Sequence, residues 1–440
     1  MAGAEADQGP CPDPAAPPVS NDGREPAVGT PTRNRGLTGR LAGAGLITGV
    51  LALSACSAAG GSTAEEERVA GDVPQEILRR SGFDTAASDL ADDLRGAGDP
   101  GAARAAVERH GAGLWRAAVD RAQGEGRVSG DLGAGDDRPL YWARLGMVSA
   151  LREWEPSFPL EDAERAALVS DLEGLSRGHG EMDFPEDPDA LRVVVTGFDP
   201  FGGDRDGNPS GAAALALDGT TVRTESGPVA IEAAVFPVRW SDFTDGMVER
   251  VLLPHYTGGR PADAVVTVSQ GGGGFDLEAY NGAWRGGSPD NVGDRAEGMI
   301  PVPEGVPTVD PQPQWSESTL DRGAIAAAET GRFPVRDSTG VVEVPEGESE
   351  RVDREDGPTA GSTAVSGSGG DYLSNEIAYR NTLLRDATGR DIPAGHVHTP
   401  VPRFGTADEE VVTDEAFERD RADIVDQVRA IVLEAVAARP

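Results

Sequence analysis

The chain has 440 residues, more than the roughly 250 that a single hydrophobic core usually organises, so we expect two domains with flanking tails. Acidic residues outnumber basic ones by 75 to 39, and the formal net charge of -36 argues against a nucleic-acid partner and fits a well-solvated acidic surface, outside the cell or in high salt. The sequence holds no lysine, which excludes a Walker-type phosphate loop, a pyridoxal Schiff base and a Ser-Lys dyad.

The N-terminal part has the pattern of a targeting segment. Residues 1–32 are rich in Pro, Gly, Ala and acidic residues and are expected to be disordered. An arginine-containing segment, 33–40, precedes the apolar run 41–55, which is shorter than the roughly 20 residues that cross a bilayer. The run ends in Leu-Ser-Ala-Cys, which resembles the lipobox of bacterial lipoproteins, a family in which the peptide is cut before a cysteine that is then lipidated.

We therefore predict a leader and signal peptide over 1–56, a lipid anchor to the membrane at Cys56 and a flexible tether over 57–73. A signal peptide or anchor without lipid, or a buried core helix, would be the alternatives. Cys11 and Cys56 are the two cysteines of the chain, and cleavage would remove Cys11. The C-terminal two thirds can therefore contain no disulfide, thiolate metal site or cysteine nucleophile.

A helical pattern extends over 74–186, where apolar residues recur at a spacing of three to four and Gly and Pro interrupt the segments. Trp115, Trp142 and Trp154 fall on the apolar faces, so we expect them to be core residues. No motif in this region carries chemistry. We interpret it as an accessory helical unit that packs on the second domain.

From 187 to 440 the pattern changes to alternating strands and helices, which predicts an α/β domain with helices on both faces of a sheet. The run LRVVVTGF is β-branched and continuous, as in a strand buried on both faces. A segment rich in Gly, Ser, Pro and acidic residues, 336–368, is expected to be a mobile insertion. The predicted strands are 191–196, 229–238, 262–269 and 395–402, and the predicted helices are 240–256, 319–331 and 414–438.

Open α/β sheets bind ligands beyond the carboxyl ends of their strands, and two glycine-rich segments lie there. In TGFDPFGGDRDGNPS, the residues Phe198, Phe201 and Asn208 would suit a flat, partly polar ligand, although an ordinary packed loop could have the same composition. In SQGGGGFDLEAYN, four glycines allow the backbone to approach a ligand, and Glu278 follows eight residues after Gln270. A glutamate alone could equally be a surface residue.

Two further segments carry a hydroxyl and two imidazoles. Ser374, in SGSGGDYLSNEIAYRN, stands near a predicted helix N-terminus, where it is either a nucleophile or an N-cap. His396 and His398 would share one face of a strand, but no third histidine or carboxylate cluster follows at a metal-ligand spacing, so we predict no metal site. Together Ser374, His398 and Glu278 could act as nucleophile, base and orienting acid.

These segments, in this order, resemble pyroglutamyl peptidase I, the pyrrolidone-carboxylate peptidases, over about 191–435. The matching stretches are VTGFDPFGG…NPS, SQGGGGFDLEAYN…PDN, GGDYLSNEIAYR and GHVHTP. The resemblance implies a mixed α/β sheet and removal of N-terminal pyroglutamate from peptides without metal or cofactor. It implies His398 as the base and Glu278 as the orienting acid. The lactam pocket would be formed by Phe198, Phe201, Asn208, Gln270, Tyr372 and Leu373.

The sequence departs from that family at Ser374, where the family has its nucleophilic cysteine. A thiol ionises readily, whereas a serine hydroxyl must lose its proton to His398 during attack. A misplacement of about 1 Å in a site shaped for sulfur can cost about 100-fold in rate. Outside the membrane, however, a serine resists the oxidation that inactivates a thiol. We therefore expect a surface-tethered serine hydrolase acting on a peptide or lactam substrate, and the alternative is an inactive protein that binds such ligands.

Overall fold

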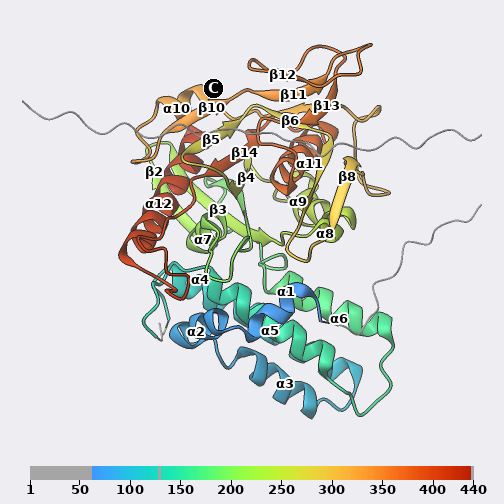
Figure 1. Ribbon diagram of the computed structural model, residues 1–440, viewed down its shortest axis with the longest axis vertical. Coiled ribbons are helices and arrows are strands. Elements are labelled where there is room, and N and C mark those ends of the chain that lie inside the picture. The colour runs from blue at the N-terminus through green and yellow to red at the C-terminus, as the bar shows by residue number, and fades with distance from the viewer. Residues whose placement is uncertain (1–61, 127–129, 438–440) are drawn as a thin grey trace, which may run out of the picture. The chain divides into compact units, whose positions relative to one another are not determined.

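A seven-stranded mixed sheet organises the C-terminal part of the chain in the computed structural model, which describes residues 62–126 and 130–437 (Figure 1). Four central strands run parallel in the order β14-β4-β1-β3, β2 lies antiparallel on β3, and β5 lies antiparallel to β14 and parallel to the edge strand β10. The predicted mixed α/β fold is confirmed. The strands are β1 Leu191–Phe198, β2 Thr220–Thr224, β3 Gly227–Phe236, β4 Ala264–Gln270, β5 Phe275–Glu278, β10 Val335–Ser338 and β14 Ala394–Thr399.

Helices cover both faces of this sheet. Along β1, Val193 and Val195 contribute to one hydrophobic cluster and Val194 to another, because successive side chains of a strand point to opposite faces. The first cluster includes residues of α7 and α12, and the second includes residues of α8, α9 and α11. The helices of this domain are α7 Pro209–Leu217, α8 Trp240–Thr244, α9 Met247–Thr257, α10 Arg322–Ala327, α11 Leu373–Ala387 and α12 Glu415–Ala437.

The helix predicted over 240–256 is interrupted. Gly246 has a φ of +76°, a left-handed conformation that glycine adopts readily, and it separates α8 from α9. The helix predicted over 319–331 is also shorter than expected, because it begins only after Asp321, which accepts a hydrogen bond from the Ala324 amide as an N-cap.

The segment 336–368, expected to be a mobile insertion, is folded into strands. Its first residues complete the edge strand β10, and the rest forms a three-stranded antiparallel sheet in the order β12-β11-β13. Two antiparallel pairs, β6 with β9 and β7 with β8, form separate small sheets, and β6 and β7 contact β13 of this segment. The additional strands are β6 Tyr280–Gly282, β7 Trp284–Pro289, β8 Arg295–Met299, β9 Trp315–Glu317, β11 Val341–Val344, β12 Val352–Arg354 and β13 Thr363–Ser366.

The region before the sheet is helical, and it shares a hydrophobic core with one face of the sheet. Trp115, Trp142 and Trp154 are buried, as predicted, and belong to the same cluster as Val193 and Val195 of β1. The helical region therefore packs directly on the α/β domain. The prediction of a flexible tether over 57–73 is wrong from Ala64 onward, because helices begin there and Glu65 and Glu66 are buried. Its elements are α1 Ala64–Glu67, the 3-10 helix η1 Arg68–Ala70, α2 Asp72–Ser81, α3 Ala86–Gly96, α4 Pro100–Ala122, α5 Arg138–Glu153 and α6 Asp162–Leu175.

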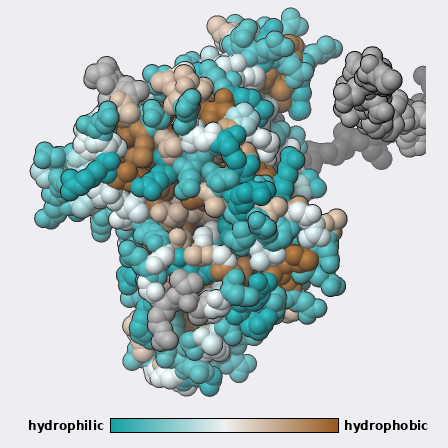
Figure 2. Space-filling view, turned by 90° about the vertical axis from the view of Figure 1, so that its left-hand side faces the viewer, coloured by the Kyte–Doolittle hydropathy of each residue, from teal (hydrophilic) through white to brown (hydrophobic). Residues whose placement is uncertain are grey.

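The predicted signal peptide, Cys11 and the lipidation site Cys56 lie outside the described residues. Within residues 62–126 and 130–437, no helix combines the length and apolar character needed to cross a membrane. Figure 2 shows one face of the molecule, where hydrophilic side chains predominate and hydrophobic ones form small separate patches. This surface is consistent with the strongly negative charge of the chain.

Candidate active site

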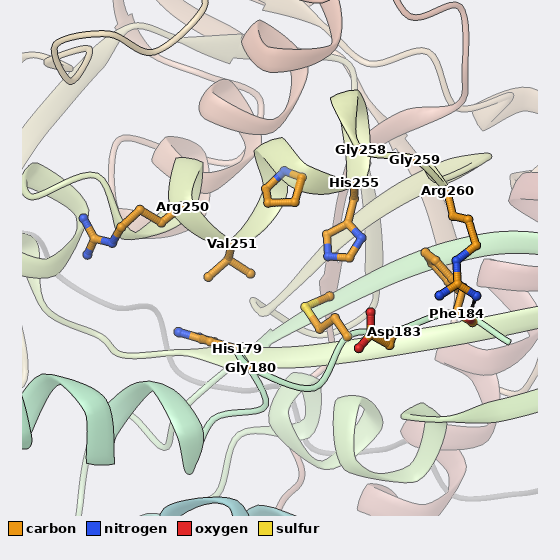
Figure 3. A pocket seen from close by; sticks show the side chains of 12 residues that line it. His179, Gly180, Asp183, Phe184, Arg250, Val251, His255, Gly258, Gly259 and Arg260 are labelled. Carbon is orange, nitrogen blue, oxygen red and sulfur yellow. Dashed lines mark hydrogen bonds between the residues drawn. The ribbon is translucent and has the colours of Figure 1, made fainter. Parts of the chain in front are cut away.

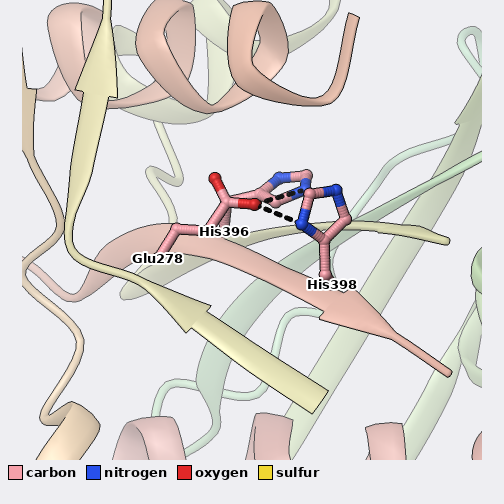
Figure 4. A group of neighbouring side chains, drawn as sticks. All are labelled: Glu278, His396 and His398. Carbon is pink, nitrogen blue, oxygen red and sulfur yellow. Dashed lines mark ion pairs between the residues drawn. The ribbon is translucent and has the colours of Figure 1, made fainter. Parts of the chain in front are cut away.

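A buried carboxylate and an imidazole meet at the junction of β5 and β14. Glu278 is the last residue of β5, and its Oε1 atom lies 2.6 Å from Nδ1 of His398 on β14 (Figure 4). The antiparallel pairing of the two strands, in which His398 faces Asp276, directs both side chains to the same side of the sheet. The Glu278 side chain is fully buried, whereas His398 remains 12% exposed, so His398 can exchange a proton with a bound ligand.

The two groups shift each other's pKa. Burial alone would raise the pKa of Glu278, but the two neighbouring imidazoles, His396 and the hydrogen-bonding His398, outweigh burial and hold that pKa below its ordinary value. Burial alone would lower the pKa of His398, but the carboxylate of Glu278 outweighs burial and raises that pKa above its ordinary value. The pair therefore resembles the base and orienting acid of a hydrolase, in which the carboxylate stabilises the protonated imidazole.

His396, two residues before His398, has a different environment. Thr267 donates its hydroxyl proton to the Gly395 carbonyl at 3.1 Å, so its oxygen is free to accept the Nδ1 proton of His396 at 2.7 Å. The remaining ring nitrogen, Nε2, then accepts a hydrogen bond from the Ser269 hydroxyl at 2.7 Å. Burial lowers the pKa of His396 to about 4, so this histidine is a neutral, hydrogen-bonded core residue at physiological pH.

The same three residues could be considered as metal ligands. Glu278, His396 and His398 each offer a donor atom, and these atoms lie within 4.8 Å of one another. However, both nitrogens of His396 already have hydrogen-bond partners, and Nδ1 of His398 faces Glu278. A metal ion would have to displace these contacts, so the donor set fits a proton-transfer pair better than a metal centre.

Ser374 is the second residue of α11 and is half-buried. The N-cap position is occupied by Tyr372, whose side chain makes no capping hydrogen bond, so the first amide groups of this 15-residue helix have no side-chain partner there. Such amides carry a partial positive charge that favours an anion. Ser374 is therefore not an N-cap, because Tyr372 occupies that position.

A small cavity, with a volume of about 180 Å³, joins Ser374 to the predicted lactam-binding residues. All six of these residues line it together with Ser374, and Val238, Ser269 and Gly271 complete the lining. The six are Phe198, Phe201, Asn208, Gln270, Tyr372 and Leu373. The structure thus brings together residues from four segments of the chain. The most distant pair, Phe198 and Ser374, is 176 positions apart (374 - 198).

Gly271 connects the cavity to the buried pair. A Cβ atom on Gly271 would lie 2.8 Å from the Cβ atom of His398, so this glycine allows His398 to approach the cavity wall. Among the residues that the structure describes, the Ser374 hydroxyl makes no hydrogen bond with His398. Contacts of this kind are often long in an unliganded enzyme and shorten when substrate binds.

The polar groups of the cavity differ in their hydrogen bonding. Asn208 accepts a hydrogen bond from the Ser210 amide at 3.1 Å and donates one to the Asp199 carbonyl at 2.9 Å, so its side chain holds the loop. In contrast, Oε1 of Gln270 is buried without a hydrogen-bond partner among the described residues. A buried acceptor without a partner is costly, so Gln270 is suited to accept a hydrogen bond from a ligand N–H group.

Two features of the site were not found from the sequence. Gly369 lies against Glu278 so closely that a Cβ atom there would be 1.8 Å from Oε1, and the GSGG stretch was the signal for this close approach. Asp199, between the two cavity-lining phenylalanines, forms ion pairs with Arg144 and Arg177 of the helical region. No local motif indicates these pairs, because the partners are distant in sequence.

A larger cavity, of about 520 Å³, lies elsewhere in the molecule and contains none of the predicted site residues. It is bordered by the segment His179–Phe184 and by the C-terminal half of α9. Figure 3 shows His255 reaching from α9 toward Asp183 in this cavity. The candidate site is therefore chosen by the chemistry of its residues and not by cavity size.

The chain matches two family profiles, described as the PA0049 N-terminal domain over residues 51–173 and the PA0049 C-terminal domain over 192–313 and 332–403. It is 35% identical, over 423 aligned residues, to the uncharacterized protein PA0049 of Pseudomonas aeruginosa, and the alignment covers 74% of this chain and 76% of that protein.

Among solved structures, a mutant pyrrolidone carboxyl peptidase from Pyrococcus furiosus is 20% identical, with 57% of this chain and 100% of that chain covered and a TM-score of 0.40. The pyroglutamyl peptidase I of Bacillus amyloliquefaciens is 21% identical, with 56% and 95% covered and a TM-score of 0.36.

Proposed function

The chain belongs to the PA0049 family, and we propose that its α/β domain is a hydrolase that removes N-terminal pyroglutamate from peptides. The observation that carries this proposal is the cavity in which Ser374 meets the six predicted lactam-binding residues beside the Glu278–His398 pair. The motif resemblance supplies the substrate class. The cavity is small, and its lining includes the aromatic side chains of Phe198, Phe201 and Tyr372, which fits a five-membered lactam ring better than an extended side chain.

In the proposed reaction, the Ser374 oxygen attacks the carbonyl carbon that links pyroglutamate to the next residue. His398 takes the hydroxyl proton on Nε2, while Glu278 holds Nδ1 and stabilises the imidazolium. His398 then returns the proton to the departing amine as the C–N bond breaks. Water, deprotonated by the same imidazole, attacks the resulting ester and releases pyroglutamate and free Ser374.

The oxyanion of the tetrahedral intermediate needs hydrogen-bond donors. The Gly271 amide already donates to the Thr399 carbonyl at 2.8 Å, so it is not available. The first amides of α11, which have no side-chain cap, are the better candidates. Gln270 would accept the lactam N–H on its unpaired Oε1 atom, which would explain selectivity for a ring that carries this donor.

The proposal is tested by comparing a fluorogenic pyroglutamyl amide with the matching prolyl amide on the soluble form that starts after Cys56. Proline has the same ring size but lacks the ring carbonyl and is positively charged at neutral pH. We expect hydrolysis of the pyroglutamyl amide only, abolished in Ser374→Ala. Equal hydrolysis of both substrates, or activity that survives in Ser374→Ala, would refute the proposal.

A second candidate function is binding without catalysis. The observation that favours it is the absence of a hydrogen bond between Ser374 and His398 among the described residues, together with the serine that stands where the pyroglutamyl peptidases have cysteine. Two results together would support this alternative. The native protein would not hydrolyse the pyroglutamyl amide whereas Ser374→Cys would, and calorimetry would detect binding of pyroglutamate or a pyroglutamyl peptide. No binding of either ligand would dismiss it.

We further propose that the protein is anchored to the membrane by a lipid on Cys56 and acts outside the cytoplasm. The support comes from the sequence Leu53-Ser54-Ala55-Cys56 and the preceding apolar run. Partition of the full chain into the detergent phase of Triton X-114, lost in Cys56→Ser, is the expected result. Partition of both proteins into the aqueous phase would contradict the anchor.

A further inference from the structure

The loop that carries the aromatic wall of the cavity is held by charged side chains of the helical region. We propose that the helical region is a working part of the site, and that Arg144 and Arg177 are positioning residues that fix Phe198, Phe201 and Asn208 through Asp199. The catalytic consequence of this inference rests on the proposed function, whereas the structural consequence does not.

The central contact is a buried ion-pair cluster around Asp199. Arg144 on α5 donates from Nη2 to one carboxylate oxygen, and Arg177, two residues after α6, donates from Nε to the other at 2.9 Å. Both arginine side chains are fully buried and the Asp199 side chain is 3% exposed. Charges removed from water in this way are tolerated only when they are paired, so the cluster defines a single position for Asp199.

Asp199 transmits this position to the cavity through its neighbours. Phe198 precedes it directly, and Phe201 follows two residues later, and both line the cavity. The Asp199 backbone carbonyl accepts the hydrogen bond from the side chain of Asn208, the third cavity residue of this loop, at 2.9 Å. The Asp199 amide donates to the Phe236 carbonyl at 2.9 Å, which ties the loop to the end of β3.

The same loop is held at two other points, once directly by the helical region and once through Asn291 of the α/β domain. Asp137, just before α5, accepts a hydrogen bond from the Asn208 amide at 2.8 Å. Asn291 donates to the Pro200 carbonyl at 2.9 Å and also to Oε1 of Glu65 on α1 at 3.0 Å. The loop is therefore attached to α1 through Asn291, to the start of α5, and to Arg144 and Arg177. Together these contacts restrict the movement of the loop relative to the helical region.

This arrangement explains why a helical region without chemical motifs packs beside the site. A lactam pocket depends on the placement of its aromatic wall, so a displaced wall should weaken substrate binding. Loops of an α/β sheet are intrinsically more mobile than the strands that carry them. The buried arginines restrict that mobility and hold the aromatic wall in place. Replacing one of them should therefore weaken substrate binding more than it slows the chemical step.

The test compares Arg144→Gln with Arg121→Gln in the soluble chain that starts after Cys56. Arg121 is a matched control, because it is a buried arginine of the same region that donates to the Leu132 and Ala134 carbonyls. Within the described residues it makes no hydrogen bond or ion pair with the loop 198–208. Both variants are expected to lower the melting temperature. Arg144→Lys, which keeps the charge, is the conservative variant. We expect it to change hydrogen exchange and KM less than Arg144→Gln does.

Hydrogen exchange measured by mass spectrometry provides the readout that does not require activity. We expect exchange in the peptide covering 197–208 to become at least about tenfold faster in Arg144→Gln and to stay unchanged in Arg121→Gln. For the pyroglutamyl amide, we expect KM to rise about 10- to 100-fold in Arg144→Gln with a smaller change in kcat.

Equal exchange in 197–208 for both variants would overturn the inference. If neither variant nor the native protein hydrolyses the substrate, the proposed function fails, while faster exchange confined to Arg144→Gln would still establish the positioning role. A drop in kcat with unchanged KM would also contradict the inference, because it would place the effect in the chemical step.

Discussion

Replacing Glu278 by glutamine tests the buried pair most specifically, since glutamine keeps the size of the side chain and removes its charge. In the native protein, His398 must be neutral to accept the serine proton, and Glu278 raises the pKa of His398 above its ordinary value. The acid limb of kcat/KM should therefore lie above the ordinary histidine value of about 6.5. Below that limb the protonated imidazole cannot act as a base.

An opposite charge within hydrogen-bond distance shifts a pKa by about 1–3 units, and the two groups are 2.6 Å apart. In Glu278→Gln we therefore expect the acid limb to move about 1–3 pH units toward acid, because the imidazole stays neutral at lower pH. We also expect the plateau of kcat/KM to fall roughly 100- to 10,000-fold, because the imidazolium that forms during attack loses its stabilising charge.

The assay is the pH profile of pyroglutamyl-amide hydrolysis, and Asp276→Asn is the matched control. Asp276 also lies on β5 and also raises the pKa of His398, but its contribution is weaker and its carboxylate pairs with Arg336 at 2.7 Å. Asp276→Asn should shift the limb much less than Glu278→Gln does. An acid limb that stays in place in Glu278→Gln would refute the assignment of His398 as the base paired with this carboxylate.

Gly369→Ala should reduce activity about 100-fold or more, because its Cβ atom would collide with Glu278. Gly272→Ala, which has open space around its Cβ position, should remain active. Equal losses of activity in the two variants would contradict this packing argument. Gln270→Leu should raise KM for the pyroglutamyl amide about 10- to 100-fold by removing an acceptor for the lactam N–H, and an unchanged KM would remove that role. Burial, followed by the charge of Asp136, raises the pKa of Asp137 from 3.8 to about 7, so this carboxyl should contribute a loss of stability as pH rises between those values. Asp137→Asn should abolish that loss and raise stability at pH 8 by up to about 4 kcal/mol, and an unchanged pH dependence of the melting temperature would refute it.

Much of the sheet could be predicted because burial leaves a strong local pattern. The β1 strand is covered on both faces, so its sequence is a continuous apolar run rather than an alternating one. The short strands β5 and β10 were missed, because four residues such as Phe275–Glu278 and Val335–Ser338 contain too few apolar positions for a period to show. Their pairing depends on contacts that form only in the folded chain.

The parts of the candidate site that lie in sequence motifs could be predicted. The ion pairs between residues distant in sequence could not. Ser374, Glu278 and His398 stand in segments with a recognisable order, and the cavity contains all six of the expected lining residues. In contrast, Arg144 and Asp199 are 55 positions apart, and each occurs in an unremarkable local sequence. A buried ion pair of this kind leaves no periodic or compositional signal, so the contact between the helical region and Asp199 could not be predicted from the sequence.

The central claim, that Ser374 is the nucleophile, is tested most directly by trapping the covalent intermediate. The soluble chain would be mixed with a pyroglutamyl ester, quenched in acid during turnover, digested and examined by mass spectrometry. We expect one pyroglutamyl group on the peptide that contains Ser374, and none in Ser374→Ala. A native protein that turns over the ester while this peptide stays unmodified, or that carries the group on another residue, would contradict the account.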